Sequence, residues 1–121
     1  MADKMELKKR AYLFAVMLIK FIDTLDTRNI TNQIIAKQLI RCATSIGANI
    51  IEAQAGSSKR DFTNFFAHAL KSANETLFWL HLLKDTRNIS GSDFEKILNE
   101  SQEIANILGA SILTLKGKKK F

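Results

Sequence analysis

Apolar residues recur at every third or fourth position through four long segments of the chain, and polar residues fill the positions between them. On an α-helix this spacing gathers the apolar side chains into one stripe. Alternating steps of four and three residues are also typical of the seam between antiparallel helices. The pattern therefore predicts helices over residues 5–26, 32–55, 59–84 and 92–115.

The predicted helices are joined by short connectors, which favour neighbours that run in opposite directions. Four such helices specify an all-α fold, an antiparallel up-down-up-down four-helix bundle. The absence of proline and an apolar content of 46% fit this class. A length of 121 residues is typical of one domain with its own core. We therefore predict a single domain over residues 1–121, in which residues 116–121 form a basic tail.

Two of the connectors contain the same pentapeptide. Asp26–Ile30 precedes the second predicted helix, and Asp85–Ile89 precedes the fourth. Each copy is followed by a hydroxyl residue, Thr31 or Ser90, which is suited to cap the first turn of a helix. The repeat can be interpreted as a binding loop or as two helix starts of similar design. The second interpretation is favoured, because capping chemistry alone explains it.

The connector between the second and third helices predicts a tight helical hairpin. Gly56 is suited to end the second helix in the left-handed conformation. Ser58 together with Asp61 then offers a cap for the third helix.

The second predicted helix has more apolar surface than a small bundle needs. It carries a second apolar stripe beside the first, and the two together cover roughly 200° where a surface helix buries about 100°. Small residues in the second stripe, such as Ala43 and Gly47, would let another helix approach closely. The excess favours a homo-oligomer, and the alternative is a bundle in which this helix is central. The candidate interface residues are Ala36, Ile40, Ala43, Gly47, Ile51, Phe65 and Trp79.

Polar residues form a margin along the core of the second and third helices. Asn49 falls between the polar edge and the apolar stripe, and a single buried asparagine commonly fixes helix register. The margin can be interpreted as a functional pocket or as ion pairs and register-setting contacts, and the second interpretation is favoured. Its members are Arg41, Ser45, Asn49, Glu52 and Glu75.

The net charge of +6 is carried entirely by the two ends of the chain, residues 1–10 and 116–121. Between them, residues 28–71 are mainly basic and residues 72–115 are mainly acidic. A polarised charge distribution can steer nucleic acid, and it can equally pair subunits. For the terminal lysine run, the alternative is a tail that only contacts solvent.

The remaining residues indicate no reaction chemistry. A di-iron bundle needs Glu-x-x-His motifs on two helices, and no glutamate here has a histidine three residues later. His68 and His81 are thirteen positions apart, too far to bind one metal ion together, and no glycine-rich phosphate loop occurs.

The single Cys42 excludes an internal disulfide, and no apolar run approaches the length of a membrane span. We therefore expect a non-enzymatic, cytoplasmic protein without a metal or cofactor.

The second helix resembles a known family. The residues Arg41-x-Ala43-x-Ser45-Ile46-x-x-Asn49-Ile50-x-Glu52 resemble the signature of bacterial four-helix bundle proteins encoded in intervening sequences of 23S ribosomal RNA genes. The likeness continues at Ser58–Phe62 and covers residues 30–83. Gly47 stands where many members have proline, and Ala53 stands where many have glycine.

The resemblance implies a bundle that assembles as a ring, usually a pentamer, and it implies no catalytic site. The accessory variability determinant of diversity-generating retroelements is similar in fold and basic, and it is thought to engage nucleic acid and a reverse transcriptase. This similarity favours nucleic acid as a partner by analogy.

The leading functional hypothesis is a non-enzymatic oligomeric bundle that binds RNA or other nucleic acid through phosphate contacts. The alternative is a protein-interaction scaffold whose lysine-rich tails contact only solvent and bind no nucleic acid. A third class, an enzyme with a site between subunits, has no positive support in the sequence. The candidate nucleic-acid contacts are Lys8, Lys9, Arg10, Lys59, Arg60, Lys118, Lys119 and Lys120.

Overall fold

The computed structural model describes residues 6–117, and its regular elements are four α-helices. No strand occurs within that range, so the all-helical prediction is confirmed. The fourth helix has the predicted bounds, whereas the first is shorter and the third longer than predicted. The helices are α1 (Leu7–Ile22), α2 (Ile30–Gln54), α3 (Lys59–Arg87) and α4 (Ser92–Leu115).

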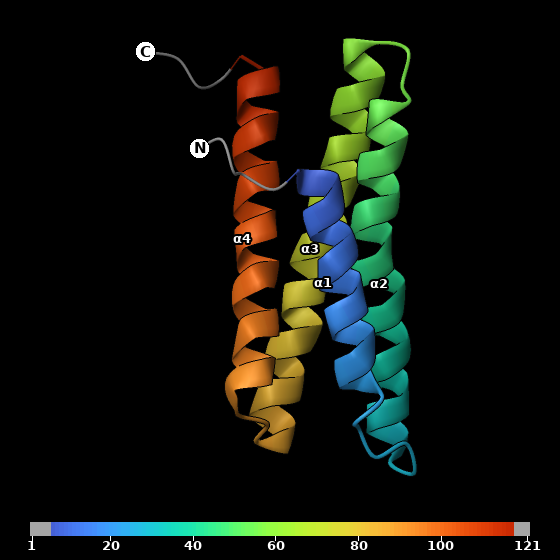
Figure 1. Cartoon of the computed structure of the whole chain (residues 1–121), viewed down its shortest axis with the longest axis vertical. Helices are drawn as coiled ribbons and strands as arrows, with labels where there is room; N and C mark the ends of the chain where they lie inside the picture. The colour runs from blue at the N-terminus through green and yellow to red at the C-terminus, as the bar shows by residue number, and fades with distance from the viewer. Residues whose placement is uncertain (1–5, 118–121) are drawn as a thin grey trace.

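The helices lie side by side, and each runs back along the one before it (Figure 1). The start of α1, the connector between α2 and α3, and the end of α4 lie toward one end of the molecule, the upper end in Figure 1. The contact between α2 and α3 is the most extensive, and that between α1 and α4 is the least extensive. With 16 residues, α1 is much shorter than its neighbours. Grooves lie on both of its sides, one toward α4 and one toward α2.

The core is formed by the inward stripes of all four helices. In α1 the buried positions are Ala11, Phe14, Leu18 and Ile22, which follow the predicted spacing. Full burial of a large apolar side chain contributes about 1.5–3 kcal/mol to folding. The core of residues 6–117 also contains the buried hydroxyl of Ser101, which has no hydrogen-bond partner within that range.

The first copy of the repeated pentapeptide starts α2, but not through the predicted residue. The N-cap is Asn29, whose side-chain oxygen accepts a hydrogen bond from the Asn32 backbone N–H at 3.0 Å. Thr31 lies inside the helix, so its predicted capping role is wrong. Asparagine is among the preferred N-cap residues, because its side-chain oxygen reaches the N–H group of the third helical residue.

The second copy of the pentapeptide ends a helix instead of starting one. Its first three residues form the last turn of α3, and Asn88 closes that helix in the left-handed conformation with φ 53°. Ser90 caps nothing, because α4 begins after Gly91 without a side-chain cap. The prediction of two equivalent helix starts is therefore wrong. The buried Leu80 and Leu83 anchor α3 directly before the second copy, and the helix continues through the first three residues of that copy.

Arg87 of the second copy joins the two connectors. Its guanidinium donates to Asn32 Oδ1 from Nε and to Asn29 Oδ1 from its terminal nitrogen, both at 3.0 Å. The equivalent residue of the first copy, Arg28, pairs only with Asp26, two residues away. Identical sequences thus make a long-range tie in one copy and a local ion pair in the other.

The hairpin between α2 and α3 is capped as predicted at one side only. Ser58 Oγ accepts from the Asp61 backbone N–H at 3.1 Å, which confirms the N-cap of α3. Gly56 does not have a positive φ, so the left-handed ending is wrong. A Cβ at position 56 would lie 3.2 Å from both Ala53 O and Asp61 Cβ. The glycine therefore serves close approach of the two helix ends.

The different roles of the two pentapeptide arginines predict different effects on stability. Arg87→Ala removes two cross-connector hydrogen bonds and leaves the Asn32 side chain under-satisfied, so we expect a loss of about 1–2 kcal/mol in the free energy of unfolding. Arg28→Ala is the matched control and should have little effect, because its ion pair is exposed. Urea denaturation measures both. Equal effects of the two substitutions would contradict the long-range role of Arg87.

Candidate functional site

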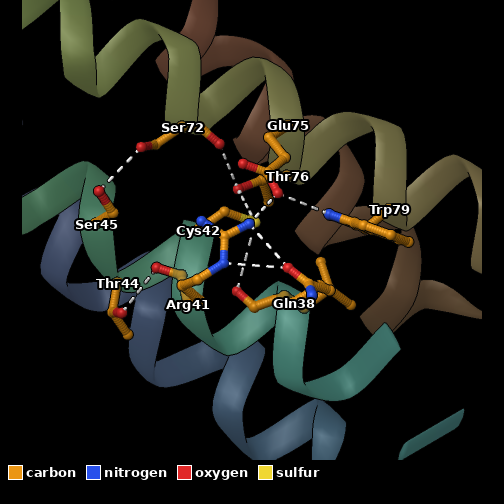
Figure 2. A network of polar contacts seen from close by, with 10 residues as sticks. Gln38, Arg41, Cys42, Thr44, Ser45, Ser72, Glu75, Thr76 and Trp79 are labelled. Atoms are coloured by element: carbon orange, nitrogen blue, oxygen red, sulfur yellow. Dashed lines mark hydrogen bonds and ion pairs between the residues drawn. The ribbon is translucent and has the colours of Figure 1, made fainter. Parts of the chain in front are cut away.

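A network of polar side chains runs along the seam between α2 and α3 (Figure 2). The Arg41 guanidinium donates to the Glu75 carboxylate and, at 2.9 Å, to Gln38 Oε1. Trp79 Nε1 donates to the same Glu75 oxygen, Oε2, at 3.1 Å. Glu75 is therefore held from both helices, and its other oxygen points away from these contacts.

A second part of the network joins hydroxyl and amide groups. Ser72 Oγ of α3 donates to Ser45 Oγ of α2 at 2.9 Å. Asn49 Nδ2 lies 2.9 Å from both Ser45 O and Ser45 Oγ. The Ser45–Ser72 contact joins the two helices, whereas both Asn49 contacts stay within α2, so the register role of Asn49 stays a prediction.

The network reaches the core at Cys42. The Thr76 hydroxyl lies 3.2 Å from Cys42 Sγ and 2.8 Å from the Ser72 carbonyl oxygen. Burial raises the pKa of the Cys42 thiol, and the hydrogen bond with Thr76 only partly offsets this effect. A buried, protonated thiol is a poor nucleophile, so Cys42 has the character of a packing residue.

Four of the five predicted margin residues take part in this network, and Glu52 does not. Glu52 is exposed, and within residues 6–117 it forms no ion pair. Ser72 and Thr76 were not predicted as members. An antiparallel register that sets Arg41 opposite Glu75 also sets Ser45 opposite Ser72. This relation could have predicted Ser72 as a member of the network from the sequence.

The network borders a groove of about 460 Å³, which we call the polar groove. Phe65 and His68 contribute rings whose centroids are 6.5 Å apart. Phe65, predicted to lie in an oligomer interface, thus lies beside the polar margin. The polar groove is lined by Ser45, Asn49, Phe65, His68, Lys71, Ser72 and Glu75.

The predicted basic residues lie mainly toward one end of the bundle. Lys8 and Lys9 are exposed in the first turn of α1, and Lys59 and Arg60 are exposed in the first turn of α3. Both turns lie toward the upper end of Figure 1. The predicted contacts Lys118, Lys119 and Lys120 fall outside the described residues.

Arg10 differs from the other predicted basic contacts, because it is engaged within the chain. Its Nε lies 2.6 Å from Glu100 Oε2, and its terminal nitrogen lies 3.5 Å from Glu103 Oε1. The hydrogen bond with Glu100 raises the pKa of Arg10 further above its ordinary value. Arg10 therefore ties α1 to α4, and its assignment as a phosphate contact is corrected.

The predicted interface residues do not form one surface. Ala43 is fully buried in the core of its own chain, so its assignment to an interface is wrong. Gly47 faces α1, because a Cβ there would lie 3.6 Å from Ala11 Cβ, an ordinary contact that packing within the chain tolerates. Trp79 belongs to the α2–α3 seam through its bond to Glu75.

An apolar groove of about 610 Å³ runs between α1 and α2. Gly47 and the exposed Ile51 line it from α2, and Tyr12 lines it from α1 with 67% of its surface exposed. Of the other predicted interface residues on α2, Ile40 is exposed and Ala36 is half-buried. The sequence-based prediction missed Tyr12. Its position next to Ala11, on the apolar stripe of α1, could have indicated an aromatic side chain at the edge of that stripe.

The described part of the chain offers no evident metal site. No group of three His, Cys, Asp or Glu side chains lies close enough together in residues 6–117 to hold an ion. In the same range, no helix is both long and apolar enough to cross a membrane.

Comparison with known proteins identifies relatives of this fold. The family described as 23S rRNA-intervening sequence protein matches residues 3–110. A crystal structure of a protein of unknown function from the S23 ribosomal protein family of Bacteroides thetaiotaomicron is similar, with a TM-score of 0.79 and 38% sequence identity. The similarity covers 88% of this chain and 98% of that one. A search of curated proteins finds no match.

The environment of Cys42 predicts slow reaction with thiol reagents. Because the thiol is buried and its pKa is raised, we expect Ellman's reagent to label the native protein at least ~100-fold more slowly than the unfolded chain in urea. Absorbance of the released thiolate measures both rates. A native rate close to the unfolded rate would mean an accessible thiolate and would contradict this assignment.

Proposed function

The chain belongs to the 23S rRNA-intervening sequence protein family, and from that premise we propose that it is a non-enzymatic, oligomeric helical bundle that binds RNA in the cytoplasm through phosphate contacts. The observation that carries the proposal is a group of exposed basic side chains toward one end of the bundle, none of which forms an ion pair within residues 6–117.

The first turns of α1 and α3 and the end of α4 lie toward the upper end of Figure 1. Arg10 is paired with Glu100 and Glu103, but the other cations of these segments form no ion pair within residues 6–117. They are therefore available to phosphates, which are the main source of affinity in nucleic-acid binding. We call this set the basic end; it contains Lys8, Lys9, Lys59, Arg60 and Lys116.

At the opposite end, three cations are engaged. Arg28 lies 3.0 Å from the Asp26 carboxylate, and Lys84 lies 3.7 Å from that of Glu95. Arg87 at the same end donates to two asparagine side chains. Phosphate binding by these three residues would have to break these contacts, and exposed cations without an ion pair in the described chain, such as Lys20 and Lys96, are fewer there than at the basic end. The proposal therefore places RNA at the basic end.

Assembly into a ring, with a pentamer as the expected state, is the second part of the proposal. Its support is the exposed apolar surface on two different sides of the protomer. Tyr12 and Ile51 border the groove between α1 and α2, and Phe78 projects from α3 with 58% of its surface exposed. Two distinct apolar surfaces suit a head-to-tail contact that closes into a ring. A ring would also repeat the basic end and raise the avidity for RNA.

The phosphate-binding part of the proposal predicts a steep salt dependence. The affinity for a labelled structured RNA should fall linearly with salt on logarithmic axes, and the double substitution Lys59→Gln with Arg60→Gln should reduce the slope by about 1–2. Fluorescence anisotropy at several salt concentrations measures the slope.

The matched control is Lys20→Gln with Lys96→Gln, which removes the same charge from exposed positions far from the basic end. It should leave the slope nearly unchanged. Absence of RNA binding at micromolar protein, or an equal effect of both double substitutions, would contradict the proposal. In the first case, a protein-interaction scaffold becomes the better hypothesis.

The assembly part predicts a mass change on substitution of Ile51. The natural protein should have a mass several times that of the 13.6 kDa chain, whereas Ile51→Asp should give a folded protomer, because it places a charge in an apolar contact. Light scattering after size exclusion measures the mass, and circular dichroism checks the fold. Leu113→Asp, at an exposed position of α4, is the matched control. A monomeric natural protein, or an unchanged mass for Ile51→Asp, would contradict this interface.

A further inference from the structure

We propose that the polar groove between α2 and α3 binds one unpaired nucleobase of the RNA, an inference that rests on the proposed RNA-binding function. The groove combines three features of base recognition: an aromatic wall, hydrogen-bonding groups without a partner, and a nearby cation. Its volume of about 460 Å³ lies within the usual range of small-ligand sites.

The aromatic wall comes from one face of α3. Phe65 and His68 are three residues apart, and their ring centroids are separated by 6.5 Å with an interplanar angle of 57°. Phe65 is anchored against the core, whereas His68 is exposed. An anchored ring beside an exposed one gives a base a surface on which to stack, and stacking on aromatic side chains is a common way in which proteins hold unpaired bases.

The opposite side of the polar groove offers unsatisfied polar atoms. Among residues 6–117, no group donates to Asn49 Oδ1, because the Asn49 contacts use its Nδ2 atom. Ser45 Oγ accepts from Ser72, and its own proton has no acceptor in the same range. A neighbouring acceptor and donor match the amino group and ring nitrogen on the edge of adenine or cytosine.

The charged side chains of the polar groove are compatible with a bound nucleotide. Lys71 lines the polar groove and forms no ion pair with any carboxylate of the described chain. Glu75 also lines it, but Arg41 and Trp79 already hold one of its oxygens. The groove is therefore not strongly acidic, and a phosphate next to the bound base can approach Lys71.

The polar groove also lies within reach of the basic end. Six residues of α3 separate Lys59 from Phe65, which corresponds to about 9 Å along the helix axis. A single strand with a rise of ~3.4 Å per nucleotide covers this distance in about three nucleotides. One strand can therefore place its phosphates on the basic end and a base in the polar groove. A closed duplex cannot, because its bases remain stacked inside.

Anisotropy titrations with a labelled single-stranded RNA test the inference. We expect Phe65→Leu to weaken binding by about 5- to 150-fold, the usual effect of losing one base stack, and to leave the salt slope unchanged. Leu113→Ala is the control, since it changes an exposed apolar side chain outside the polar groove and outside the proposed interface. His68→Ala is the second test variant, because its exposed side chain is not needed for folding.

The competitor RNAs separate this inference from the proposed function. An unlabelled duplex of equal length should compete poorly, and an oligonucleotide without bases should bind the natural protein about as weakly as the natural RNA binds Phe65→Leu. Two results would overturn the base site and leave phosphate binding intact. One is salt-dependent binding that neither Phe65→Leu nor His68→Ala weakens. The other is competition by the duplex that equals that of the single strand. Absence of any RNA binding would overturn both.

Discussion

The seam between α2 and α3 is the contact on which the rest of the structure depends. It is the most extensive helix pair of the bundle, and its inner half is apolar while its outer half is polar. Apolar burial supplies most of the free energy, but it specifies position only loosely, since aliphatic side chains tolerate sliding. The hydrogen bonds between Ser45 and Ser72 and between Arg41 and Glu75 require one register. Stability and register thus come from different sides of the same seam.

Once this register is fixed, the polarity of the helices determines which ends meet. The tight turn at Gly56 brings the end of α2 to the start of α3 at one end of the bundle. The short connector after α3 lies at the other end, so α4 runs back and finishes at the end where Gly56 lies. Basic residues that are far apart in the sequence therefore lie toward one end. At the other end, Arg87 reaches across to Asn29 and Asn32 and holds the two connectors together. The gathering of basic residues at one end and the Arg87 contacts at the other both follow from this topology.

Helical periodicity was sufficient to predict the four helices and most core positions, because burial depends on the spacing of apolar residues along one helix. It was not sufficient where the outcome depended on a residue far away. The pentapeptide repeat gave two different structures, because its second copy directly follows the buried Leu83 and continues α3, whereas its first copy lies between the end of α1 and the start of α2. Arg10 was predicted as a free cation, yet its partner Glu100 lies ninety residues away. Ala43 was assigned to an outer stripe, and α1 covers that side of α2 in the bundle.

The length of α3 explains how one helix can serve both stability and binding. Its 29 residues span about 43 Å, more than α1 can cover. The second half of α3 contains the fully buried Leu80 and Leu83 and ends at the Arg87 contacts, so it is anchored in the core and in the connectors. The first half begins at the basic end and carries Phe65 and Lys71 to the polar groove. A ligand bound along this first half meets a helix whose position is set elsewhere, so recognition requires no rearrangement of the core.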